Sequence, residues 1–130
     1  MLAMLVALLT AASAVCAAVP DAVPPVSENV MDHGARADGF VDDTTAFQKA
    51  LDAATPGGGI VFVPAGTYLI KGSLNVPQGV TLRGVWEAPH HADIGKGTVI
   101  HATGGAGNEN GTPLITLNQS SCVRGVTIFY

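Results

Sequence analysis

The segment Val30–Gly66 constrains the fold more than any other part of the 130-residue chain. It contains a short apolar stretch, a loop with Gly and Asp, an amphipathic segment, a Gly-rich turn and a second apolar stretch that ends in Pro-Ala-Gly. Residues 43–54 carry apolar side chains at positions i, i+1, i+4, i+5 and i+8, which lie on one face of a helix. Asp42 or Asp43 is placed to cap this helix, because a carboxylate there can accept hydrogen bonds from free backbone N–H groups. We therefore predict one short helix between two strands.

The residues before the helix are expected to form a linker, a short strand and a loop. Residues 19–29 are rich in proline and polar side chains and are predicted as the linker, with a short strand near residues 29–31. The loop at residues 33–41 contains Gly34 and Gly39. Both suit backbone positions with positive φ, which glycine adopts at little steric cost.

After the helix, apolar runs of three to five residues recur between turn residues. No Asn-Gly or Asp-Gly two-residue turn joins one run to the next, so the pattern is not typical of hairpins. The sequence VTLRGV at Val80–Val85 is echoed inexactly at Val123–Ile128, which indicates a solenoid of parallel strands. The amphipathic helix would cover the open edge of the first coil. The predicted strands are Ile60–Val63, Thr67–Ile70, Leu74–Val76, Val80–Leu82, Thr98–His101, Leu114–Leu117 and Val126–Phe129.

The opening segment resembles that of the pectate-lyase-like superfamily, in its rhamnogalacturonase and epimerase-like branch. The resemblance covers roughly residues 30–130 and implies an all-β, right-handed parallel β-helix with an amino-terminal capping helix. It is specific for the fold and weak for the reaction, because one fold hosts many chemistries. The matching residues are Gly34, Ala35, Asp38, Gly39, Asp42, Asp43, Thr44, Ala46 and Phe47, followed by Gly58, Gly59, Ile60–Val63, Pro64, Gly66 and Tyr68.

Residues 30–130 are accordingly expected to be the amino-terminal part of one β-helix domain. The chain stops directly after the strand-like sequence VTIFY, with no Gly, Pro or charged residue to end the strand. We therefore expect the domain to be truncated at its carboxy end.

Residues 1–18 read as a secretory signal peptide. Leu2 to Ala18 contains no charged residue and is mostly Ala, Leu and Val, with small residues near the end. The alternative is an uncleaved membrane anchor, although the apolar stretch is marginal for a span of about 20 residues. We expect a secreted, periplasmic or extracellular protein with no membrane contact after cleavage.

The charge distribution argues against nucleic-acid binding. The formal net charge is −4, only 12% of residues are charged, and the six basic residues are scattered from Arg36 to Arg124. No basic stripe is present to neutralise a phosphate backbone.

Four acidic residues in the opening segment, Asp32, Asp38, Asp42 and Asp43, could form a calcium site or supply catalytic carboxylates. Their spacing does not fit the calcium-loop template, which needs oxygen ligands at alternate positions and a Glu at the twelfth. Turn formation and helix capping make better use of them.

The histidines and the Gly-rich segment are weaker candidates. His90, His91 and Asp93 could suggest a metal site, but adjacent residues project to different sides of an extended chain, and a solvated loop between coils is the favoured interpretation. His101 is a lone histidine at the end of a predicted strand. Gly104–Gly111 lacks the Lys-Ser/Thr and helix that follow a phosphate-binding loop. We assign no catalytic, cofactor-binding or metal-binding residue.

Cys122 is the one cysteine outside the predicted signal peptide and is interpreted as a small buried hydrophobe, with a partner thiol further along the chain as the alternative. Arg83 and Arg124 each precede a Gly in the echoed sequences. They are either solvent-facing turn residues or a subsite for an acidic sugar, because guanidinium binds carboxylate in a bidentate manner. Asn110 and Asn118 fit N-glycosylation acceptors, if the source is eukaryotic.

The resemblance implies a carbohydrate-active protein whose partner is a polysaccharide. The expected function is that of a polysaccharide lyase or glycoside hydrolase acting on a pectin-like acidic polymer, with catalytic residues beyond Tyr130 and with calcium if the enzyme is a lyase. The alternative is a non-catalytic glycan-binding, adhesive or structural β-helix protein.

Overall fold

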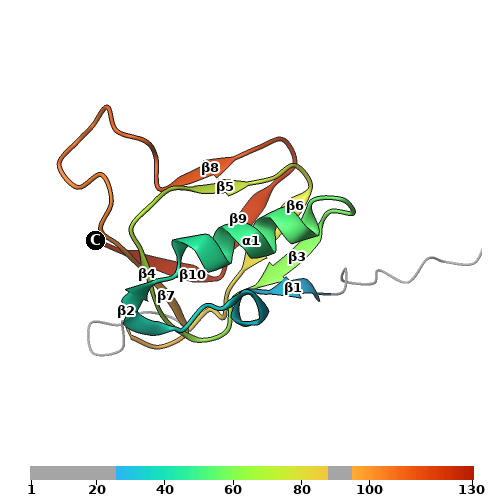
Figure 1. Cartoon of the computed structure of the whole chain (residues 1–130), viewed down its shortest axis with the longest axis horizontal. Coiled ribbons are helices and arrows are strands. Elements are labelled where there is room, and N and C mark those ends of the chain that lie inside the picture. The colour runs from blue at the N-terminus through green and yellow to red at the C-terminus, as the bar shows by residue number, and fades with distance from the viewer. Residues whose placement is uncertain (1–25, 88–94) are drawn as a thin grey trace, which may run out of the picture.

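The computed structural model describes residues 26–87 and 95–130, and these contain ten strands, one α-helix and one 3-10 turn (Figure 1). The predicted signal peptide, most of the predicted linker, and His90, His91 and Asp93 lie outside the described residues. No helix of the described part is both long and apolar enough to cross a membrane. The elements are β1 (Val26–Asn29), η1 (Val30–His33), β2 (Asp38–Asp42), α1 (Thr44–Ala54), β3 (Gly59–Phe62), β4 (Gly66–Ile70), β5 (Leu74–Val76), β6 (Val80–Arg83), β7 (Thr98–Ala102), β8 (Ile115–Leu117), β9 (Cys122–Arg124) and β10 (Val126–Phe129).

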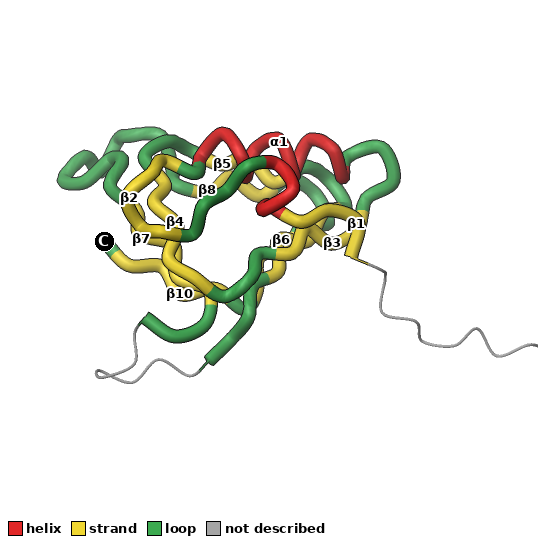
Figure 2. Tube along the Cα trace, turned by 60° about the horizontal axis from the view of Figure 1, so that its bottom comes forward, coloured by secondary structure: helices red, strands yellow, loops and turns green. Residues whose placement is uncertain are grey.

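All strand pairs in the described residues are parallel, and they form three sheets. Sheet A has the order β1-β3-β6-β9, sheet B has β10-β7-β4-β2, and sheet C has β5-β8. Along the chain, β3, β4 and β5 visit sheets A, B and C in turn, and β6, β7 and β8 repeat this order as the next coil. The sheets surround a shared apolar core (Figure 2). The prediction of a mostly β chain with parallel strands and one helix is confirmed.

Successive coils stack in register, so equivalent side chains lie beside one another. Leu82 on β6 is opposite Val123 on β9, and Arg83 is opposite Arg124. The echoed sequences therefore occupy neighbouring positions in space. Leu82 is fully buried and Val123 packs against the core from the next coil, which explains why apolar residues recur at this position.

Helix α1 covers one end of the core and forms as predicted. Its apolar stripe is buried, and the Phe47 ring meets the Tyr68 ring edge-on, with centroids 5.2 Å apart and planes at 73°. Burial of Phe47 and Leu51 contributes about 1.5–3 kcal/mol each. The buried helical residues are Ala46, Phe47, Ala50, Leu51 and Ala54.

Helix α1 also pairs with the backbone of sheet C. Strand β5 bonds to β8 on one side, and on its other side the Gln48 amide takes the place of a strand. The Asn75 N–H donates to Gln48 Oε1 at 3.0 Å, and Gln48 Nε2 donates to the Asn75 carbonyl at 3.2 Å. One side chain thereby satisfies a donor and an acceptor that an edge strand would otherwise leave without a protein partner.

Asp43 has a different role from the predicted helix cap. Its side chain makes no bond to the first turn of α1. The carboxylate is 1% exposed and accepts hydrogen bonds from the N–H groups of Arg36 at 2.8 Å and Ala37 at 3.3 Å. Burial of Tyr68, together with the nearby negative charge of Asp43, raises the pKa of Tyr68 to about 12. Asp43 thus fixes the opening loop against the core rather than the helix end.

Asp42 supplies the hydrogen bond at the start of α1. Its carboxylate accepts from the Thr44 N–H at 3.0 Å and from the Lys71 N–H at 3.4 Å. Partial burial opposes ionisation, but the hydrogen bonds from Thr44 and Lys71 outweigh it and lower the pKa of Asp42. The first helical turn is therefore tied to the loop that joins β4 and β5.

Several predicted boundaries are wrong at the amino-terminal end. Residues 26–29 form β1 and pair with β3, so they are not part of a linker. A strand was expected near residues 29–31, but residues 30–33 form a 3-10 turn. Most of β2, at residues 38–42, falls in the loop predicted at residues 33–41, and this strand pairs with β4. Both strands are specified by the neighbouring coil, since they have no apolar run of their own. The positive φ angles predicted for Gly34 and Gly39 are confirmed, at 97° and 73°.

Replacing Asp43 by Ala should lower the free energy of unfolding by about 2–4 kcal/mol, because two backbone N–H groups of the opening loop lose a buried, charged acceptor. Urea unfolding measures this loss. Asp52→Ala is the matched control: Asp52 is exposed on α1 and accepts a hydrogen bond from Gln48 Nε2. It should change stability by no more than about 0.5 kcal/mol. Equal losses in the two variants would contradict the role assigned to Asp43.

Replacing Gln48 by Ala should cost about 0.5–1.5 kcal/mol and expose the edge of β5, because Asn75 loses both backbone hydrogen bonds to the helix. Amide hydrogen exchange at Asn75 should accelerate more than exchange at Leu74, whose N–H donates to the Leu114 carbonyl. Lys49→Ala, one position along the helix and exposed, provides the control. Unchanged protection of Asn75 in Gln48→Ala would show that the side-chain amide does not protect this edge.

Candidate functional site

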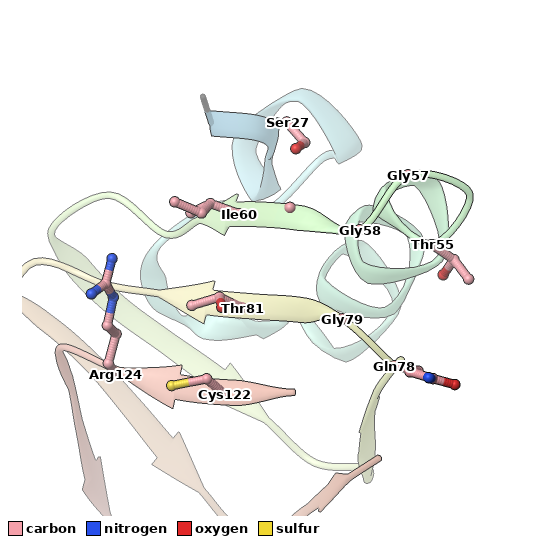
Figure 3. A pocket seen from close by; sticks show the side chains of 11 residues that line it. Ser27, Thr55, Gly57, Gly58, Ile60, Gln78, Gly79, Thr81, Cys122 and Arg124 are labelled. Carbon is pink, nitrogen blue, oxygen red and sulfur yellow. The ribbon is translucent and has the colours of Figure 1, made fainter. Parts of the chain in front are cut away.

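The outer face of sheet A carries the candidate site. Val61 and Leu82 point into the core and are fully buried, so the residues beside them in β3 and β6 point outward. Ile60, Thr81 and Cys122 form one row on the outer face across three strands, in which Ile60 is buried and Cys122 is exposed. Figure 3 shows this row projecting to the same side of the sheet. The next outward row is Phe62, Arg83 and Arg124.

A broad hollow of about 910 Å³ lies over the first of these rows, and we call it the outer groove. Side chains with hydroxyl and amide groups line it, together with glycines of the turns that precede β3 and β6. Among its lining residues Arg124 is the one charged group, and none is a carboxylate. The lining residues are Ser27, Thr55, Gly57, Gly58, Gly59, Ile60, Gln78, Gly79, Thr81, Cys122 and Arg124 (Figure 3).

A second hollow of about 420 Å³ adjoins the outer groove, and we call it the arginine hollow. Arg124 lines both, and its neighbour in the hollow is Arg83 from the next strand. Trp86 forms part of the rim and is 60% exposed. The lining residues are Phe62, Arg83, Gly84, Val85, Trp86, Arg124 and Gly125.

Two stacked glycines bring the arginines together. The Gly84 N–H donates to the Arg124 carbonyl at 2.9 Å, and a Cβ on Gly84 would lie 2.8 Å from side-chain carbons of Thr98 and Val126. Gly125 has φ of 69°, which favours glycine. Only a glycine pair permits this close approach, so the Arg-Gly sequence that recurs in the chain has a direct structural reason.

Thr98 holds the start of the segment that carries Trp86. Its side chain is fully buried, and its hydroxyl accepts from the Val85 N–H at 2.8 Å and donates to the Val63 carbonyl at 2.9 Å. The Thr98 N–H in turn donates to the Val85 carbonyl at 2.9 Å. Both the N–H and the carbonyl of Val85, the residue before Trp86, are therefore hydrogen-bonded to Thr98.

The acidic residues of the opening segment do not meet in a site. The Asp38 carboxylate accepts from the N–H groups of Val41 and Phe40, and these bonds lower the pKa of Asp38. Asp42 and Asp43 bond to backbone N–H groups as described above. Within the described residues, no three His, Cys, Asp or Glu side chains lie close enough to hold a metal ion.

Cys122 is exposed, which corrects the prediction of a buried position. It alternates with Val123 along β9, and Val123 takes the inward place. His101 is half-buried, and its ring lies 5.7 Å from that of Phe129 on the neighbouring strand. Neither residue has a partner suited to acid–base chemistry among the described residues.

The two candidate glycosylation positions differ. Asn118 Nδ2 donates to Asn75 Oδ1 and to the Val76 carbonyl, both at 2.8 Å, so its amide already has a structural role. Asn110 lies exposed in the loop between β7 and β8, and its backbone N–H donates to Asn108 Oδ1. Both residues are exposed, and they differ in that the Asn118 amide is already held by two hydrogen bonds.

Comparison with known proteins identifies relatives. Residues 27–126 match the family model described as Rhamnogalacturonase A/epimerase, pectate lyase-like. Mannuronan C5-epimerase AlgE5 of Azotobacter vinelandii is 56% identical over 45 residues, which are 34% of this chain and 4% of that protein. Alginate lyase 7 of the same organism is 46% identical over 55 residues, which are 42% of this chain and 6% of that protein.

The fold also matches a solved structure. The A-module of Azotobacter vinelandii mannuronan C-5 epimerase AlgE4 superposes with a TM-score of 0.58 and 28% identity over 78% of this chain and 28% of that chain. This chain therefore spans only a small part of the two curated relatives named above and about a quarter of the A-module.

Replacing Thr98 by Val should cost about 1–3 kcal/mol, because the Val85 N–H loses the buried hydroxyl that accepts its hydrogen bond while the shape of the residue is kept. Urea unfolding and hydrogen exchange at Val85 measure the effect. Thr116→Val makes the same chemical change at an exposed position of β8 and should be near neutral. Comparable losses in the two variants would rule out Thr98 as the anchor of this segment.

Proposed function

We propose that this chain is part of a secreted protein that modifies a uronate-containing polysaccharide. The premise is that the chain belongs to the rhamnogalacturonase A/epimerase, pectate lyase-like family. The family match over residues 27–126 is the observation that carries the proposal. Its relatives include an alginate lyase and a mannuronan C5-epimerase, whose names denote action on carboxylated polymers. The strands of the described residues are proposed to wind as a right-handed solenoid, with residues 1–18 as the signal peptide.

The proposed substrate is an acidic polymer of the pectin or alginate type. These polymers share a carboxylate on their uronate residues, and the two arginines on the outer face of sheet A offer matching charge. The proposed reaction is that of a polysaccharide lyase or glycoside hydrolase, and the named relatives favour a lyase or an epimerase over a hydrolase.

The catalytic groups are proposed to lie outside the described residues. The outer groove and the arginine hollow contain no carboxylate among their lining residues. A glycosidase needs a pair of carboxyl groups across the sugar bond. Calcium would be expected for a lyase, but Asp38, Asp42 and Asp43 do not fit a calcium site because their carboxylates are bonded to backbone N–H groups.

A non-catalytic glycan-binding or adhesive role is the second candidate. The absence of carboxylates from both hollows of the described part favours it, because hydroxyl, amide and guanidinium groups suffice to bind a sugar chain.

Assays of the full-length protein on polygalacturonate, rhamnogalacturonan, alginate and polymannuronate test the proposal. New reducing ends with ultraviolet absorbance from unsaturated products would identify a lyase, and reducing ends alone would identify a hydrolase. A change in sugar configuration by NMR without chain cleavage would identify an epimerase. Turnover on at least one of these polymers is the expected result.

Asp42→Ala and His101→Ala should retain turnover when their folds are intact, and loss of turnover in either would overturn the placement of the catalytic groups. Glycan binding without turnover would support the second candidate. Neither binding nor turnover on any of the four polymers would refute the proposed function.

A further inference from the structure

We propose that the arginine hollow is a binding site for uronate residues of a polysaccharide, in which Arg83 and Arg124 hold carboxylate groups and Trp86 packs against a sugar ring. The ligand class rests on the proposed function. The site itself rests on the charge, shape and exposure of the residues that line the hollow.

The charges of the two arginines are not balanced within the described residues. Arg83 and Arg124 lie directly opposite each other on neighbouring parallel strands, and such strands are about 4.8 Å apart. Neither guanidinium forms an ion pair with a described residue, and the acid nearest in sequence, Glu87, pairs with neither. Like charges directly opposite each other on a sheet are unfavourable. An anion bound between them would remove this repulsion and gain two charge-assisted contacts.

The shape of the hollow suits a sugar better than a small anion. Its volume of about 420 Å³ is within the range of ligand sites. Phe62 lies at one end of the arginine row and Trp86 is 60% exposed at the rim. An indole ring provides a large, rigid surface with a polar edge, which can pack on the apolar face of a sugar ring. A small anion would make no use of these aromatic groups.

The hollow continues into a surface suited to further sugar residues. Arg124 also lines the outer groove, where Thr81, Gln78, Thr55 and Ser27 present hydroxyl and amide groups. These groups can donate to and accept from sugar hydroxyls. The arrangement therefore fits an extended polymer, with its carboxylates at the arginine hollow and its hydroxyls along the groove.

The arginines do not point to a nucleic acid. The chain carries a formal net charge of −4, and the hollow contributes only two of its six basic residues. Binding of a phosphate backbone depends on neutralising many phosphates along a basic stripe. Recognition of a few carboxylates by paired guanidinium groups needs only this local charge.

Calorimetric titration of the full-length protein with oligogalacturonates and oligomannuronates tests the site. Arg124→Gln should weaken binding of at least one oligouronate about tenfold or more, and Arg83→Gln should do the same. Arg124→Lys keeps the charge but not the bidentate geometry and should bind with intermediate affinity. Arg36→Gln removes the same charge from an exposed residue outside both hollows and should bind as the unchanged protein does.

Tryptophan emission provides a second measurement. Ligand should change the emission of the unchanged protein, and Trp86→Phe should remove that change. The melting temperature of each variant shows whether it is folded. Arg124 is the decisive position, because its side chain is exposed and its replacement should leave the fold intact.

Three outcomes would overturn the inference. The first is equal affinity of Arg124→Gln and Arg36→Gln for the oligouronates, and the second is that a neutral polymer or inorganic polyphosphate binds as tightly as the oligouronates. The third is that the protein turns over one of the four polymers but binds no oligouronate. The last outcome leaves the proposed function intact. A protein with neither uronate binding nor turnover fails both proposals, so the two failures can be told apart.

Discussion

The open edge of a stack of parallel strands is the constraint on which the rest of this structure depends. Each coil leaves a row of backbone donors and acceptors for its neighbour, and the first coil has no neighbour on one side. Here the three sheets begin differently. Sheet A begins with β1, sheet B begins with β2, and sheet C is covered by α1. Gln48 pairs with Asn75 as a strand would, while Phe47 and Leu51 close the apolar end of the core.

This end arrangement explains which parts of the fold could be predicted from the sequence. The helix and the interior strands bury their own side chains, so the periodicity of residues 44–54 and the apolar runs reveal them. Strands β1, β2 and β9 have no such run. Their backbones are extended because β3, β4 and β6 offer pairing partners from another coil, and a single-sequence pattern does not contain that information. The buried role of Asp43 was missed for a different reason: its partners lie six and seven residues before it, in a loop whose path has no periodic sequence pattern.

The candidate site, like the fold, could be predicted only in part from the sequence. The recurrence of Arg-Gly placed Arg83 and Arg124 as equivalent residues, and the register confirms that they are adjacent. Trp86 and Thr98 were not singled out, because the surroundings of each come from other coils. Cys122 could have been placed correctly from its own strand, because Val123 is the apolar residue of the Cys-Val-Arg alternation and takes the inward position.

The same register has opposite consequences inside and outside the sheets. Inside, stacking Leu82 beside Val123 extends the apolar core, which stabilises the fold. Outside, stacking Arg83 beside Arg124 places like charges together, which does not stabilise it. The chain has more acids than bases, yet Asp38, Asp42 and Asp43 are committed to backbone N–H groups of the opening segment. These three acids thus hold the opening segment in place, while Arg83 and Arg124 lie on the outer face of sheet A without an ion pair to any described residue. The recognition of a uronate proposed above accounts both for the two guanidinium groups, which form no ion pair within the described residues, and for the exposed tryptophan beside them.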